Sequence, residues 1–167
     1  GKSHSGCVFI GMNAGLTAYT GDDNIAIGNG AMQNVDADDT VGASHSNIFI
    51  GSSAGGGAWE TAASHYNVAI GKDSMDAVMN GALRNVAMGH ASLSALTTGD
   101  DNVAIGYSAG SSLVAGVDNV IIGYNAQADA TDSGNCIVIG EGATGVASNT
   151  VTLGNASVTA VYAAQDG

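Results

Sequence analysis

The chain has 167 residues, with 26 glycines, no proline and only 11% charged residues, a composition unlike that of an ordinary globular domain. Its net charge of −12 argues against binding to nucleic acid or to an anionic lipid surface, because the long-range electrostatic field repels both. The sequence contains no apolar stretch of about 18 residues, so we expect no membrane insertion.

A short motif recurs along the whole chain, and its clearest copy is Asn102-Val103-Ala104-Ile105-Gly106. Each of nine copies ends on a glycine, and we call these the frame glycines: Gly11, Gly28, Gly51, Gly71, Gly89, Gly106, Gly123, Gly140 and Gly154. Consecutive frame glycines are 14 to 23 residues apart, which indicates a base unit of 14 to 17 residues with insertions after the second, third and fourth copies. Repetition at such a period is typical of a stack of similar coils.

Apolar residues alternate before each frame glycine, and a period of two is that of a β-strand. A coil of 14 to 17 residues has room for two short strands and two turns, with neighbouring coils ~4.8 Å apart. The sequence therefore predicts an all-β protein, a parallel β-roll or β-solenoid of about nine short coils. A propeller blade would need about 40 residues, so a propeller is disfavoured.

The two faces of each predicted strand are both apolar. We expect the outer residues, such as Val103 and Ile105, to form an aliphatic ladder in the core, with the middle residue, such as Ala104, on the opposite face. Since strands that are apolar on both faces are usually covered on both, we expect the middle residues to pack against sister chains. A small residue three positions after each frame glycine predicts that a second, tighter strand or a corner packs there.

The predicted boundaries divide the chain into three parts. Residues 1-6 are expected to be an N-terminal leader or an expression remnant, residues 7-160 the β-roll repeat domain, with insertion loops within 33-84, and residues 161-167 an extension towards a downstream segment. Cys7 and Cys136 lie seven coil steps apart, roughly 34 Å, so they cannot form a disulfide within one chain.

The pattern Asn-Val-Ala-Ile-Gly-x-x-Ala/Ser resembles the head repeats of trimeric autotransporter adhesins of the YadA type. The stretch from Val86 to Leu93, followed by Thr97 to Gly106, is more similar to repeats in the tail fibres of phages and prophages, and Ser148 to Thr159 resembles the segment that often precedes an intramolecular chaperone domain there. The resemblance implies a homotrimer in the tail fibre of a virion, serving as a structural and receptor-binding segment. Its partner would be a host-surface receptor, expected to be a glycan, held by multivalent contacts.

Two other functions stay open at this point. The first is the head of a bacterial trimeric autotransporter adhesin, on the bacterial outer surface. The second is a non-catalytic part of a polysaccharide-degrading tailspike. We expect no enzyme activity, because none of the four histidines belongs to a signature of an activated nucleophile.

The candidate receptor contacts fall into two groups. Loops on a rigid scaffold commonly carry binding residues, and the insertions between residues 33 and 84 contain several suitable side chains, namely His45, Trp59, His65, Tyr66 and Arg84. One position after the frame glycine, consecutive coils carry Lys72, His90, Tyr107, Tyr124 and Glu141, which predicts a surface ladder with rings about 5 Å apart. The alternatives are that the loops pack on themselves or in the trimer, and that the ladder serves stability alone.

Aspartates gather in the turns that precede several copies of the motif: Asp22, Asp23, Asp100, Asp101 and Asp118. Such turns are weak candidates for Ca²⁺ sites, since Ca²⁺ requires six to eight oxygen ligands. Aspartate is also common in turns because its side chain bonds to turn backbone groups. We therefore expect no cofactor, with calcium as the alternative.

Overall fold

The computed structural model describes residues 5–17, 21–34, 44–59 and 62–161. Nine three-residue strands coincide with the nine copies of the motif, and each ends directly before a frame glycine. They are β1 (Val8–Ile10), β2 (Ile25–Ile27), β3 (Ile48–Ile50), β4 (Val68–Ile70), β5 (Val86–Met88), β6 (Val103–Ile105), β7 (Val120–Ile122), β8 (Ile137–Ile139) and β9 (Val151–Leu153). Part of the predicted leader, the 35–43 part of the insertions, Glu60 and the extension from residue 162 lie outside the described residues.

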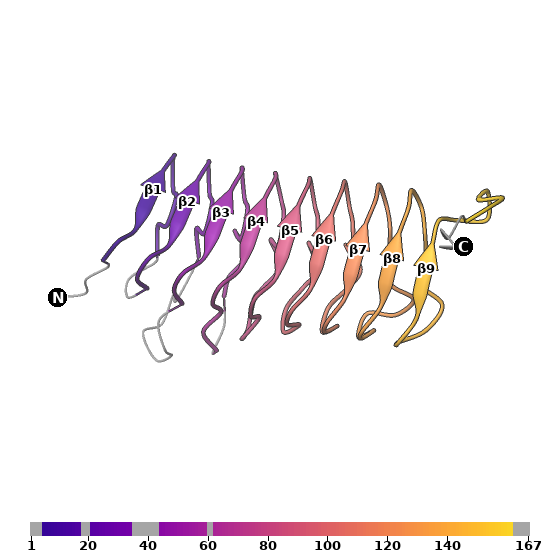
Figure 1. Cartoon of the computed structure of the whole chain (residues 1–167). Helices are drawn as coiled ribbons and strands as arrows, with labels where there is room; N and C mark the ends of the chain where they lie inside the picture. The colour runs from indigo at the N-terminus through magenta and orange to yellow at the C-terminus, as the bar shows by residue number, and fades with distance from the viewer. Residues whose placement is uncertain (1–4, 18–20, 35–43, 60–61, 162–167) are drawn as a thin grey trace, which may run out of the picture.

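The nine strands form one parallel sheet whose order follows the chain, and every pair is in register. Figure 1 shows them side by side as the rungs of a rod. The predicted β-solenoid is confirmed. The expectation of two strands per coil is wrong, because the described residues outside β1–β9 form turns and isolated bridges. Left-handed residues such as Ser108 and Asp118 interrupt the extended backbone on either side of each strand.

The frame glycines allow neighbouring coils to approach closely at the end of each strand. From Gly11 to Gly123 their φ angles lie between 130° and 143°, a conformation that favours glycine. A Cβ atom at any of these positions would lie 2.4 to 2.5 Å from the carbonyl oxygen of the next frame glycine. The close spacing of the coils therefore requires glycine, which has no side chain, at the frame positions.

The middle residue of each strand, and not the outer pair, points into the core. Ala26, Phe49, Ala69, Ala87, Ala104, Ile121 and Val138 are all fully buried. The outer residues, among them Ile105 at 38% exposure, lie on the solvent side of the sheet. Our assignment of the two faces is therefore wrong. The thin coil leaves little space behind the sheet, so mostly small middle residues face it, while the bulkier branched residues lie outside.

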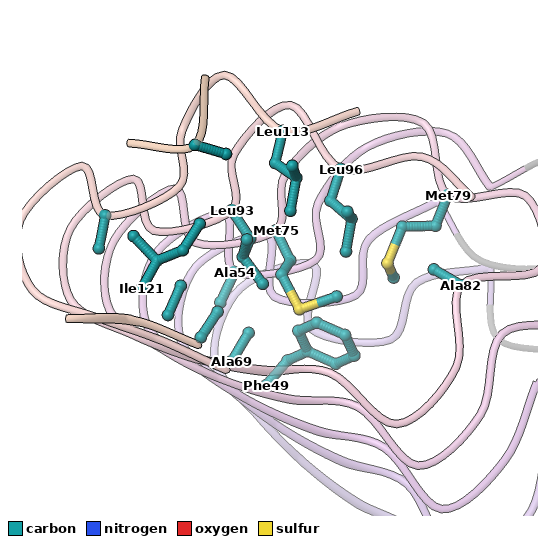
Figure 2. Close-up of a cluster of buried hydrophobic side chains, with 14 of the residues drawn as sticks. Phe49, Ala54, Ala69, Met75, Met79, Ala82, Leu93, Leu96, Leu113 and Ile121 are labelled. Carbon is teal, nitrogen blue, oxygen red and sulfur yellow. The ribbon is translucent and has the colours of Figure 1, made fainter. Parts of the chain in front are cut away.

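The wall opposite the sheet supplies the larger core side chains. Figure 2 shows Met75, Met79, Leu93, Leu96 and Leu113 gathered in the interior, with Phe49 and Ile121 reaching them from the sheet. Of the two alternatives predicted at this position, the structure has the corner, because the amide of the small residue donates to the carbonyl of the frame glycine three positions earlier. The small residue is buried in seven coils: Ala31, Ala54, Ser74, Ser92, Ala109, Ala126 and Ala143. Trp59, Met75 and Met79 lie within the stretch that holds the insertions and contribute to the core.

A column of buried asparagines runs through the rod directly before the strands, and we call it the asparagine ladder: Asn24, Asn47, Asn67, Asn85, Asn102 and Asn119. Each side-chain Nδ2 from Asn47 onward donates to the Oδ1 of the preceding asparagine, at 2.8 to 3.2 Å. Each Nδ2 also donates to a backbone carbonyl in the following coil, as Asn102 does to Gly116 at 2.7 Å. The ladder thereby satisfies buried polar groups of the turns.

Cysteines occupy the ladder position in two outer coils. The Cys7 Sγ lies 3.2 Å from the Gly21 carbonyl oxygen, and the Cys136 amide donates to the Asn119 Oδ1 at 3.0 Å. Both thiols are free, as predicted from their separation. Within the described ranges, no helix has the length and apolarity that crossing a membrane requires.

Candidate functional site

The candidate contact residues other than Trp59 lie at the two corners that flank the sheet. Residues one and two positions before the asparagine ladder form the first corner, which we call the entry corner. Residues one position after the frame glycine form the second, the exit corner. Because each coil repeats the same path, side chains from successive coils meet at both corners although 17 or more residues separate them.

At the entry corner, three of the predicted residues form a ring cluster. His45 and His65 stack with ring centroids 3.9 Å apart, and the ring of Tyr66 lies edge-on to His45 at 5.3 Å. The backbone amide of His45 donates to the Nδ1 atom of His65 at 3.1 Å. This bond requires an unprotonated Nδ1, so His65 is neutral in this arrangement. Tyr66 is 55% exposed, which makes it the most accessible ring of the cluster.

Arg84 follows on the same corner, where it forms a bidentate ion pair with Asp101. Its Nε and Nη2 atoms lie 2.6 and 2.7 Å from the two carboxylate oxygens. The hydrogen bonds from Arg84 lower the pKa of the Asp101 carboxyl group. The pair is exposed, so its contribution to stability is small, and a ligand with a carboxylate would have to compete with Asp101 for the guanidinium group.

The histidine stack makes the stability of the entry corner depend on pH. Burial, and then the neighbouring His45, lower the pKa of His65 below its ordinary value of 6.5. The unfolded chain therefore binds the proton more readily, and the stabilisation is complete above pH 6.5 and decreases as the pH falls from 6.5 towards the folded-state pKa. We expect the unfolding midpoint in urea to fall over this range, and to fall less in His65→Gln.

The control for this prediction is His90→Gln, which removes an imidazole from the other corner and leaves the stack intact. The unfolding midpoint of this variant should still fall as the pH decreases from 6.5. If the unfolding midpoint of His65→Gln fell with pH as steeply as that of the parent chain, the histidine stack would not be the cause of the pH dependence.

Trp59 does not belong to this surface. Its side chain is 4% exposed, its ring contacts Phe49 edge-on at 5.5 Å, and its Nε1 donates to the Gly55 carbonyl at 3.0 Å. The expectation of an exposed tryptophan at a receptor contact is therefore wrong. The indole group fills the core of an insertion-bearing coil, and its polar atom has a backbone partner there.

At the exit corner, the predicted ladder is present over three coils, and we call His90, Tyr107 and Tyr124 the ring row. The centroids of His90 and Tyr107 are 5.0 Å apart, and those of Tyr107 and Tyr124 are 5.2 Å apart. The interplanar angles are 9° and 19°, so neighbouring rings are stacked. Exposed Lys72 and Glu141 occupy the same position in the coils on either side.

The aspartates of the turns mostly bond to backbone or to arginine. Asp22 accepts a hydrogen bond from the Ser5 amide and Asp100 accepts one from the Leu83 amide, both at 2.8 Å, while Asp101 pairs with Arg84. Asp23, Asp101 and Asp118 have left-handed backbone conformations, which aspartate tolerates. Among the described residues, no group of three or more histidine, cysteine or acidic side chains is placed to hold a metal ion.

An apolar surface covers the outer side of the sheet, where we had predicted the core. Two columns of aliphatic side chains run along the outside of the sheet, and we call this surface the aliphatic face. Its most exposed members are Val8, Ile10, Met88, Ile105, Ile137, Ile139, Val151 and Leu153, and the remaining outer strand residues are partly exposed. A contiguous apolar surface of this kind commonly marks an interaction site.

No pocket is found on the part of the surface that the structure describes, so the candidate sites are the aliphatic face and the two corners. In comparisons with known proteins, no family model, no curated protein and no solved structure matches the chain.

Proposed function

We propose that this chain is a structural and receptor-binding segment of a homotrimeric surface fibre, of the phage tail-fibre kind. The observation that carries the proposal is the aliphatic face, which extends over all nine rungs and which a single chain leaves in contact with water. Burying such a face between identical chains removes apolar area from water, and in-register rungs provide the regular geometry for it. Three rods joined in this way leave their corners available for contacts with a host surface.

The trimer is tested by the mass of the protein in solution. Sedimentation equilibrium should give three times the 16.3 kDa of the chain. Ile105→Asp places a charge in the middle of the aliphatic face, where a buried charge without a partner is strongly unfavourable, so we expect dissociation to monomers at micromolar concentration. Thr98→Asp, at an exposed position outside the sheet, is the matched control and should remain trimeric.

Circular dichroism of both variants would establish that the rod is still folded. A parent chain that sediments as a monomer would refute the assembly, whatever the variants do.

Attachment is tested separately, by binding of fluorescently labelled protein to a panel of bacterial strains. The intact trimer should bind at least one strain, and the monomeric Ile105→Asp variant should bind it much more weakly, because three linked weak contacts give a higher overall affinity than one. Binding of equal strength by monomer and trimer would argue against a multivalent mechanism.

A further inference from the structure

The ring row has a geometry that restricts the kind of ligand it can hold. Its three rings come from consecutive rungs, stack at 5.0 and 5.2 Å and are almost parallel. Since Tyr107 has a ring on each side, both of its faces are covered within the row. The row therefore meets a ligand mainly with its ring edges and polar atoms, and not by the stacking of a sugar on an open ring face.

The polar atoms of the row are available for new hydrogen bonds. Tyr107 is 48% exposed and Tyr124 is 53% exposed. Neither hydroxyl group bonds to another residue in the described part of the chain. A phenolic hydroxyl both donates and accepts, so two of them in adjacent rungs repeat the same bonding pattern along the rod axis.

The row is also ordered before any ligand arrives. Stacking restricts the rings, and the Nε2 atom of His90 lies 3.7 Å from the Asp73 carboxylate at one end. Side chains that are already restricted lose less conformational entropy on binding, which favours even weak contacts. The in-register sheet beneath them fixes the spacing of the rungs.

The negative charge of the chain indicates which class of polymer the ring row can bind. The chain carries a net charge of −12, and the row is bordered by Asp73 and Glu141 as well as Lys72. An anionic polysaccharide or a nucleic acid would be repelled over most of the approach. A neutral polyol has no such penalty, and its hydroxyl groups can both donate to and accept from the tyrosines.

We propose that the ring row binds a neutral, extended polysaccharide that lies along the rod axis, with one sugar unit for each rung. An extended β-1,4-linked chain of pyranose units advances with each unit by a distance close to the spacing of the rings, so consecutive units can each meet one rung. This inference rests on the proposed attachment function and specifies its ligand. It also assigns the contact to the exit corner rather than to the insertion loops.

The test is calorimetric titration of the intact protein with hexamers and dimers of β-1,4-linked glucose, mannose and N-acetylglucosamine. At least one hexamer should bind at least tenfold more tightly than its dimer, because a longer chain reaches more rungs. Tyr107→Ala and Tyr124→Ala should each lower the affinity for that hexamer by about tenfold. A loss of this size is within the range measured when contact residues are truncated to alanine. Tyr107→Phe, which retains the ring and loses the hydroxyl group, should also weaken it.

Val146→Ala is the control, since it truncates an exposed side chain that lies at neither corner and should leave the affinity unchanged. Melting temperatures recorded for all variants would show that they are folded. The inference is overturned if none of the three hexamers binds, if hexamers bind no more tightly than dimers, or if Tyr107→Ala and Tyr124→Ala bind as the parent does.

The bacterial binding assay separates this inference from the proposed function. If the parent chain attaches to cells and the two alanine variants attach equally well, the ring row is not the contact but the attachment function stands. If the parent chain attaches to no strain, the attachment function fails, and the titrations alone then decide whether the row binds glycans.

Discussion

Gly106→Ala is expected to destabilise the rod by at least about 3 kcal/mol, because alanine is strained at a φ of 133°. Its Cβ would also lie 2.5 Å from the carbonyl oxygen and 2.7 Å from the carbonyl carbon of Gly123. The neighbouring coil cannot move away without breaking the hydrogen bond from the Gly123 amide to the Ile105 carbonyl, at 2.8 Å. Thermal unfolding followed by circular dichroism should show a large fall in the melting temperature.

The control for Gly106→Ala is Gly142→Asn. Gly142 has a φ of 58°, and a Cβ there would meet only the Asn155 side chain, in ordinary van der Waals contact at 3.9 Å. The equivalent residue one coil earlier is Asn125, at a φ of 51°, so asparagine fits this conformation. We expect Gly142→Asn to melt within a few degrees of the parent chain, and equal losses from the two substitutions would contradict the steric explanation.

Asn102→Ala is the second substitution with a large expected effect. It removes the acceptor of the Asn119 amide and of the Asn119 Nδ2, at 3.1 and 2.8 Å, and the donor to the Gly116 carbonyl, at 2.7 Å. Each buried polar group left without a partner costs about 1–3 kcal/mol, so we expect a loss of roughly 3 kcal/mol or more. Urea unfolding measures the loss, and amide hydrogen exchange at Asn119 should accelerate.

Asn29→Ala provides the comparison, because Asn29 is exposed and its side chain bonds to no other described residue. Its unfolding midpoint should match that of the parent chain. If Asn102→Ala were as mild as Asn29→Ala, the asparagine ladder would be a result of the fold and not one of its supports.

The strands and the frame glycines could be predicted from the sequence, because both depend on local geometry that the repeat displays nine times. The buried side of each strand could not be predicted from the sequence. Alternation separates Val103 and Ile105 from Ala104, but it does not indicate which set faces inward when both are apolar. The thickness of the coil determines which set faces inward, and that thickness depends on the turns opposite the sheet, where we expected a second strand.

The asparagine ladder could also have been predicted from the sequence. Asparagine stands directly before the strand in six copies, and a polar side chain at a fixed place in an in-register stack must meet its own kind in the next coil. Among the candidate contact residues, the stacking of the ring row was predicted correctly and the exposure of Trp59 was not. The ring row follows directly from register, whereas Trp59 lies in an insertion whose path no repeat determines.

The contact between successive frame glycines has a consequence for how such a rod changes over generations. Each coil touches mainly the coils before and after it, and the junction between any two of them is nearly the same. A duplication or loss of the coding sequence for one 17-residue unit would therefore join compatible surfaces and alter the reach of the rod by about 4.8 Å. The length of the rod can thus change in small equal steps, while its lateral surfaces remain the same.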